Sequence, residues 1–115
     1  MKVVVTFPIP DAAKQIISEH ALLQCWESEE SIPTSTLIGW ATDADAILTT
    51  LTCPIDSELL AHAPQLKIIS TVSVGVDHID VDAAAARGVI VGHTPGVLTD
   101  STADLTLALM LVVGR

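Results

Sequence analysis

One stretch of the sequence, residues 69–80, has the residue types of a binding loop between a strand and a helix. It reads ISTVSVGVDHID, a β-branched run followed by a loop with one glycine and then a helix-capping aspartate. Ligands of open α/β sheets bind beyond the carboxyl ends of the strands. Gly75 would let the backbone approach a ligand or adopt a positive φ, and consecutive N–H groups there could hold a carboxylate. A tight turn is the more frequent reason for a single glycine, so spacing alone leaves both interpretations open.

A second stretch, residues 92–104, has the same order of strand, turn and helix, and reads GHTPGVLTDSTAD. We expect Asp100 or Ser101 to cap the last helix. The hydroxyl groups of Ser101 and Thr102 would then lie at a helix N-terminus, where an anionic ligand is favoured. Capping alone also explains these residues, because Ser101 followed by Asp104 resembles a capping box.

The elements that position these loops follow from alternating apolar runs and helical signals. The expected strands cover residues 2–7, 23–26, 44–50, 66–72 and 89–91. Five helices are expected. The first follows Asp11 as its cap, and the second covers residues 36–41. The third runs from Pro54 to residue 63, the fourth covers 80–86, and the fifth runs from residue 100 or 101 onward. Gly88 stands where a left-handed residue ends a helix. Five strand–helix repeats with short loops predict an α/β fold with a doubly wound, flavodoxin-like parallel sheet of about five strands.

Composition limits the classes of protein to which the chain can belong. Its 115 residues suit one small domain. Half of the residues are hydrophobic and 17% are charged, which excludes a disordered tail. The formal net charge of -9 argues against nucleic acid or an anionic membrane as a partner. The longest apolar run, residues 107–113, is far shorter than the roughly 20 residues that cross a bilayer.

The cysteines do not form a metal-binding pattern. Cys25 and Cys53 lack the CxxC spacing, and no nearby histidine completes a zinc set. We therefore expect no metal site and two free thiols in a reducing compartment. The N-terminal apolar run is too short for a signal peptide, so we expect a cytoplasmic protein.

Taken together, the two loop stretches are specific. The segments SVGVDHID (73–80), ARGV (86–89) and TPGVLTDSTADL (94–105) resemble the D-isomer-specific 2-hydroxyacid dehydrogenase family, and most closely its glyoxylate/hydroxypyruvate reductase branch. The resemblance is dense over residues 66–115 and looser but collinear before them.

The resemblance implies roles for particular positions. The backbone N–H groups of Val74 and Gly75 would bind the carboxylate of a small 2-keto or 2-hydroxy acid, and Leu51 or a neighbour would form an apolar wall of the substrate pocket. Thr102 would contact the nicotinamide cofactor, NADP or NAD. Asp77 and His78 match the motif, and we interpret them as supports of the loop.

The resemblance also places several required parts beyond residue 115. No GxGxxG sequence occurs in the chain, and the family's substrate-binding arginine, its glutamate and its general-acid histidine have no counterpart here. We therefore expect no catalytic residue in this chain and no turnover by it alone. The expected division is a substrate-binding domain over residues 1–98 and an interdomain helix over 99–115 that leads into a Rossmann domain.

The last expected helix is apolar on nearly every face. Leucine, methionine, valine and alanine fill residues 107–113, and a helix that is apolar all round is normally buried on all sides. In the family this helix packs at a subunit interface, so the resemblance implies a homodimer formed through it and the further domain.

Two alternatives share the predicted fold class. A non-catalytic regulatory module of the same fold would keep the Val74–Gly75 carboxylate site, and the sequence leaves this alternative open. An unrelated flavodoxin-like flavin carrier would need phosphate-binding N–H groups after the first strand. Pro8 and Pro10 remove two of these donors.

Overall fold

The computed structural model describes residues 1–114, in which strands and helices alternate strictly along the chain. The strands are β1 (Lys2–Val5), β2 (Leu22–Cys25), β3 (Ala46–Thr49), β4 (Ile68–Thr71) and β5 (Ile90–Gly92). The helices are α1 (Asp11–Ser18), α2 (Thr34–Ala41), α3 (Ser57–Ala61), α4 (Val81–Ala86) and α5 (Thr99–Val113). The strand–helix alternation predicted from the sequence is confirmed.

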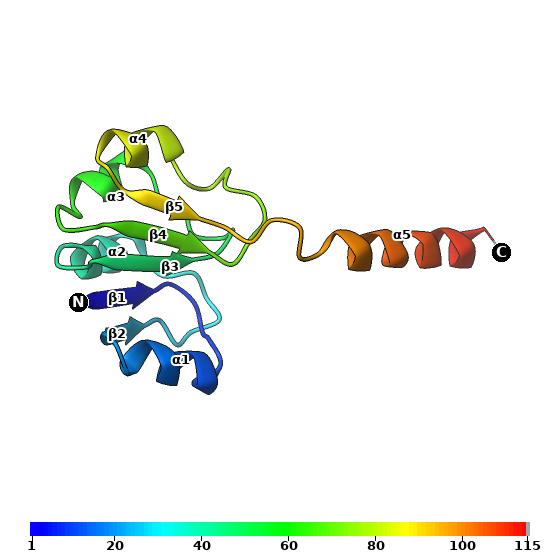
Figure 1. The fold of residues 1–115 in the computed structure, drawn as a ribbon, viewed down its shortest axis with the longest axis horizontal. Coiled ribbons are helices and arrows are strands. Elements are labelled where there is room, and N and C mark those ends of the chain that lie inside the picture. Colours follow the sequence, from blue (N-terminus) through cyan, green and yellow to red (C-terminus); the bar gives the residue numbers. More distant parts are fainter. Residues whose placement is uncertain (115) are drawn as a thin grey trace.

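The five strands form one parallel sheet in the order β2-β1-β3-β4-β5 (Figure 1). This is the strand order of flavodoxin-like doubly wound sheets, as expected. Parallel strands end at the same edge, so the loops that follow β3, β4 and β5 leave the sheet side by side. The register shows this directly, because Thr49 at the end of β3 pairs with Thr71 at the end of β4.

One face of the sheet carries the core. Helices α2, α3 and α4 pack side by side over it, whereas α1 packs beside β2 (Figure 1). The side chains of Ile47, Ile55, Leu60 and Ile69 are fully buried between the sheet and these helices. Alternate residues of a strand face opposite sides, which is why Ile69 is buried while its neighbour Ile68 is exposed. The core is aliphatic, as the scarcity of aromatic residues requires.

The start of α3 differs from the prediction. Pro54 does not open this helix, which begins at Ser57 with the Asp56 carboxylate accepting a hydrogen bond from the Leu59 N–H. The reason is tertiary: Ile55 forms a parallel bridge with Ile79 in the loop that follows β4. This bridge keeps the backbone extended at Ile55, and it also ties the loop after β4 to the body of the domain.

The start of α5 also differs from the prediction. The helix begins at Thr99, directly after Leu98, and no side chain caps it. Ser101 therefore lies inside the first turn, and the predicted capping by Asp100 or Ser101 is wrong, as is the capping box with Asp104. Gly96, with a φ of 77°, turns the chain before the expected cap.

Helix α5 projects away from the rest of the domain (Figure 1). All of its residues are exposed, including Leu107 at 60% and Leu111 at 74%. The radius of gyration is 16.5 Å, whereas a compact domain of this length has roughly 13 Å. A largely apolar helix thus has no partner among the described residues.

Gly88 provides a test of the fold that does not involve the site. Its φ of 72° ends α4 in the left-handed region, and a Cβ there would meet no atom within 4 Å. Gly88→Ala is therefore expected to lower the free energy of unfolding by about 1 to 2 kcal/mol through backbone strain alone. Gly39→Ala, at an exposed position of α2 with equal space and no positive φ, is expected to raise it by about 0.5 to 1 kcal/mol. Urea unfolding measures both, and a loss of stability in both variants would contradict this account.

Candidate functional site

The loop that follows β4 is built on a buried hydroxyl pair. Thr71 ends β4 and Ser73 opens the loop, and their side chains are 1% and 9% exposed. Their hydroxyl oxygens lie 2.6 Å apart, and the Ser73 hydroxyl donates to the Gly75 carbonyl oxygen over 2.8 Å. His78 Nε2 lies 3.1 Å from the Thr71 hydroxyl oxygen. The loop therefore folds back on its own polar side chains, while Val74 is 43% exposed.

The segment after β5 holds the same loop from the other side. The backbone N–H of Thr94 donates to the Ser73 carbonyl oxygen over 3.2 Å. His93 Nδ1 lies 2.8 Å from the Val74 carbonyl oxygen, and because a carbonyl only accepts, this nitrogen carries the proton. The Thr94 hydroxyl donates to the Val72 carbonyl oxygen over 3.0 Å. Neighbouring parallel strands bring these residues together although about twenty positions separate them.

These tethers determine where two N–H groups point. In a trans peptide the carbonyl and the following N–H are antiparallel, and residues 1–114 contain no cis bond. Because the Ser73 and Val74 carbonyls point toward the segment after β5, the N–H groups of Val74 and Gly75 point away from it. Within residues 1–114 neither N–H group has a hydrogen-bond acceptor. Two adjacent, oriented and unpaired N–H groups are what a carboxylate needs.

The backbone at Gly75 removes one of the two reasons expected for a glycine there. Positive φ values occur at Gly88 and Gly96 among the described residues, so the positive φ considered for Gly75 is wrong. A Cβ at Gly75 would meet no atom of residues 1–114 within 4 Å. Neither the turn nor the packing of these residues therefore requires glycine at this position.

His78 lies behind this loop and is partly buried. Burial lowers the pKa of His78 below its usual 6.5, and the nearby Asp77 opposes this change. The ring nitrogen Nδ1 is buried and has no hydrogen-bond partner in the described part of the chain. The neutral imidazole is therefore the favoured form at neutral pH.

The lowered pKa predicts a pH dependence of stability. The unfolded chain binds a proton at His78 below about pH 6.5, whereas the folded chain binds it only at lower pH. The free energy of unfolding should therefore be fully retained above about pH 6.5 and fall as the pH drops below it. Urea unfolding at about pH 5.5 and about pH 7.5 measures this difference. His78→Gln should reduce the difference, and an unchanged difference would show that another group causes it.

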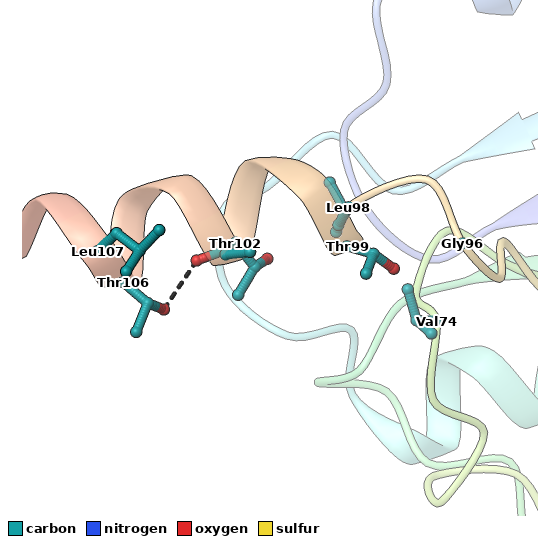
Figure 2. Close-up of a pocket in the computed structure, with 8 residues that line it drawn as sticks. Val74, Gly96, Leu98, Thr99, Thr102, Thr106 and Leu107 are labelled. Carbon is teal, nitrogen blue, oxygen red and sulfur yellow. Dashed lines mark hydrogen bonds between the residues drawn. The ribbon is translucent and has the colours of Figure 1, made fainter.

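An open hollow separates this loop from the start of α5. It has a volume of about 670 Å³ and its lining includes Val74, Leu98, Thr102 and Leu107 (Figure 2). The Thr106 hydroxyl proton is already hydrogen-bonded, because this hydroxyl donates to the Thr102 carbonyl oxygen over 2.8 Å. The Thr102 hydroxyl forms no hydrogen bond within residues 1–114. Val74 and Thr102, predicted as substrate and cofactor contacts, thus line one hollow.

The other two predicted site residues lie at the same sheet edge but not in this lining. Leu51 is 60% exposed in the turn after β3, and Gly75 lies beside Val74 without lining the hollow. His93 and Thr94, which tether the loop, were not predicted from the sequence. Their position directly after β5 was the available signal, because β5 pairs with β4.

Other kinds of site are not supported within the described residues. No group of three or more metal-ligating side chains occurs in residues 1–114, and Cys25 and Cys53 are both free thiols there. Over the same residues, no helix has the length and apolar character to cross a bilayer.

Comparison with known proteins identifies the family of the chain. Residues 3–108 match the family described as "D-isomer specific 2-hydroxyacid dehydrogenase, catalytic domain". A glyoxylate reductase of Thermococcus litoralis is 42% identical over 114 residues, which are 99% of this chain and 34% of that protein. The chain thus spans about a third of the length of the curated relatives it matches.

Solved structures share the fold over the same region. A crystal structure of a Thermus thermophilus protein is similar with a TM-score of 0.91 and 41% identity, covering 100% of this chain and 37% of that one. An NAD+-bound 3-phosphoglycerate dehydrogenase of Entamoeba histolytica is similar with a TM-score of 0.76 and 26% identity, covering 96% of this chain and 38% of that one. The chain therefore belongs to the D-isomer specific 2-hydroxyacid dehydrogenase family and matches its catalytic domain.

Proposed function

We propose that the chain is the substrate-side part of an NAD(P)-dependent 2-hydroxyacid dehydrogenase that reduces 2-keto acids of the glyoxylate or hydroxypyruvate kind. One observation carries the proposal: the N–H groups of Val74 and Gly75 are oriented at the carboxyl edge of the sheet and have no acceptor within residues 1–114. The similarity to glyoxylate reductases supports the choice of substrate.

Each proposed contact has a chemical role. The two N–H groups bind the substrate carboxylate, and Leu51 supplies an apolar wall at the same sheet edge. The Thr102 hydroxyl, in the first turn of α5 and free of hydrogen bonds within residues 1–114, contacts the nicotinamide cofactor, NADP or NAD. The cofactor supplies the hydride when it is bound, and this chain orients the carboxylate so that the carbonyl carbon is fixed.

We also propose how the protein is divided into domains. Residues 1–98 are the substrate-binding domain, and residues 99–115, which include α5, are the interdomain segment that leads into a dinucleotide-binding domain. The exposed apolar surface of α5 supports a homodimer formed through this helix. The free thiols Cys25 and Cys53 fit a reducing compartment, and we place the protein in the cytoplasm.

We also propose that residues 1–115 alone do not turn over. Reduction of a 2-keto acid requires a positioned nicotinamide and a general acid as well as a carboxylate site. We assign the general acid to none of the proposed contact residues, which are Leu51, Val74, Gly75 and Thr102. The test is to incubate the purified chain with NADPH or NADH and glyoxylate and to follow cofactor absorbance. Oxidation above background would contradict the proposal.

The carboxylate site is tested by NMR titration of the chain with glyoxylate. We expect the amide signals of Val74 and Gly75 to shift most, while glycolaldehyde, which has the same size but no carboxylate, leaves them unchanged. Equal shifts with both compounds, or shifts only at other residues, would contradict the proposed carboxylate site at Val74 and Gly75. Carboxylate binding by a longer form of the protein without turnover would instead favour a non-catalytic binding module.

A further inference from the structure

We propose that His78 is a positioning residue for the carboxylate loop, because its Nε2–H begins a one-way series of hydrogen bonds that ends on the Gly75 carbonyl. The nature of the ligand rests on the proposed function, whereas the hydrogen-bond series does not. The series runs through the Thr71 and Ser73 hydroxyl groups, over 3.1, 2.6 and 2.8 Å.

The acceptor at the end of the series determines the direction of every bond in it. A carbonyl oxygen has no proton, so the Ser73 hydroxyl must donate to Gly75. The Ser73 oxygen is then an acceptor toward the Thr71 hydroxyl, which must donate to it. Thr71 Oγ1 therefore has no proton left for His78, and the His78 Nε2 must carry a proton and donate.

The Thr71 oxygen can accept the bonds that this direction requires. It receives the Ser73 backbone N–H over 3.3 Å and lies 3.1 Å from His78 Nε2. A hydroxyl oxygen has two lone pairs, so one remains to accept from an N–H on His78 Nε2. The hydroxyl proton of Thr71 then remains for the bond to Ser73. Since Thr71 and Ser73 are 1% and 9% exposed, water does not compete for these positions.

The other side of the imidazole ring agrees with this assignment. His78 Nδ1 is buried and has no partner within residues 1–114. An unpaired buried lone pair costs less than an unpaired buried N–H or a buried charge. The surroundings of both ring nitrogens therefore favour the same neutral tautomer, which carries its hydrogen on Nε2.

The consequence lies at Gly75, which has two flanking peptides. His93 holds the peptide between Val74 and Gly75 through the Val74 carbonyl, and the series from His78 holds the next peptide through the Gly75 carbonyl. Glycine loses more conformational freedom on ordering than any other residue. Fixing both peptides before a ligand arrives removes this entropy cost from binding.

The first experiment uses the unmodified chain. Nitrogen-15 NMR of the histidine rings at about pH 7.5 reports which nitrogen of each ring carries the proton. We expect His78 to have hydrogen on Nε2 and His93 to have hydrogen on Nδ1. Hydrogen on Nδ1 of His78 would overturn the proposal, and this result depends on no variant and no ligand.

The second experiment compares variants by glyoxylate titration and by nitrogen-15 relaxation of the Gly75 amide, which reports the motion of this N–H group on the ps–ns timescale. His78→Phe keeps a ring but cannot donate, and it should weaken glyoxylate binding about tenfold, the effect of losing about one hydrogen bond, and lower the order parameter of the Gly75 amide. His78→Gln can donate and should bind within about threefold of the unmodified chain. Ser73→Ala interrupts the series and should resemble His78→Phe. His62→Phe, the same change at an exposed helix end, should alter neither measurement.

The outcomes separate the two proposals. Equal binding and equal Gly75 order parameters in His78→Phe and the unmodified chain would overturn the positioning role, as would His78→Gln behaving like His78→Phe. If the unmodified chain does not bind glyoxylate, the proposed function fails, and the tautomer and the Gly75 order parameters still decide the role of His78. If His78→Phe does not fold, the tautomer of the unmodified chain decides it.

Discussion

Replacing Leu107 and Leu111 with glutamate is expected to convert the chain from an associated form to a monomer. The two side chains are four residues apart on α5, so they lie on one face of the helix, and both are exposed in the single chain. Burying each contributes about 1.5 to 3 kcal/mol to association, and a carboxylate placed there must instead be removed from water. The dissociation constant should rise at least about 100-fold. Sedimentation over a range of concentrations measures the change.

The control adds the same charge elsewhere. Ile16 is an exposed apolar residue of α1 at 64%, and Ile16→Glu should leave the association unchanged. Association that survives the double α5 substitution would point to the exposed face of β4 and β5, where Ile68 and Ile90 are paired in register and both exposed. A monomeric unmodified chain at every concentration would contradict association through α5.

Gly75→Ala is expected to abolish or strongly weaken carboxylate binding without loss of stability. The added methyl group meets no protein atom within 4 Å, and the backbone φ is not in the left-handed region. The free energy of unfolding should therefore stay within about 1 kcal/mol, with a small increase favoured by the reduced entropy of the unfolded chain. The methyl group would stand beside the N–H groups that receive the carboxylate, so glyoxylate affinity should fall at least about tenfold.

Gly88→Ala is the matched control for this substitution. It should lower stability, because Gly88 has a positive φ. It should leave glyoxylate binding unchanged, because Gly88 precedes β5 and so lies at the opposite edge of the sheet from the loop that follows β4. The pair is measured by urea unfolding and NMR titration on the same samples. Gly75→Ala that binds glyoxylate like the unmodified chain would show that close ligand approach is not the reason for the glycine.

Local signals predicted much of the fold because they act over short distances. The β-branched runs, the aspartate cap at Asp80 and the left-handed Gly88 each depend on a few neighbouring residues, and all three features occur in the structure. The Pro54 helix start was wrong because Ile55 pairs with Ile79, a distant partner that no local signal reveals. The α5 cap was wrong because Gly96 turns the chain before Asp100.

The candidate site was likewise predicted only in part from the sequence. The motifs and their spacing predicted that Val74 and Gly75 follow a strand and that Thr102 lies in the first turn of a helix. The sequence could not show that His93 and Thr94 hold the loop, because their contacts join residues about twenty positions apart. Only the parallel pairing of β4 with β5 brings those segments together.

The amino-acid sequence by itself determined the order of strands and helices, the aliphatic core and the family resemblance, since these follow from residue type and spacing. The tertiary structure alone decided three things: that the Val74 and Gly75 N–H groups point away from the segment after β5 and are unpaired within residues 1–114, that Gly75 needs no positive φ, and that His78 faces Thr71 with its other nitrogen buried. The physical reason is that hydrogen-bond direction depends on which groups meet in space, and distant segments meet here only where parallel strands end at one edge.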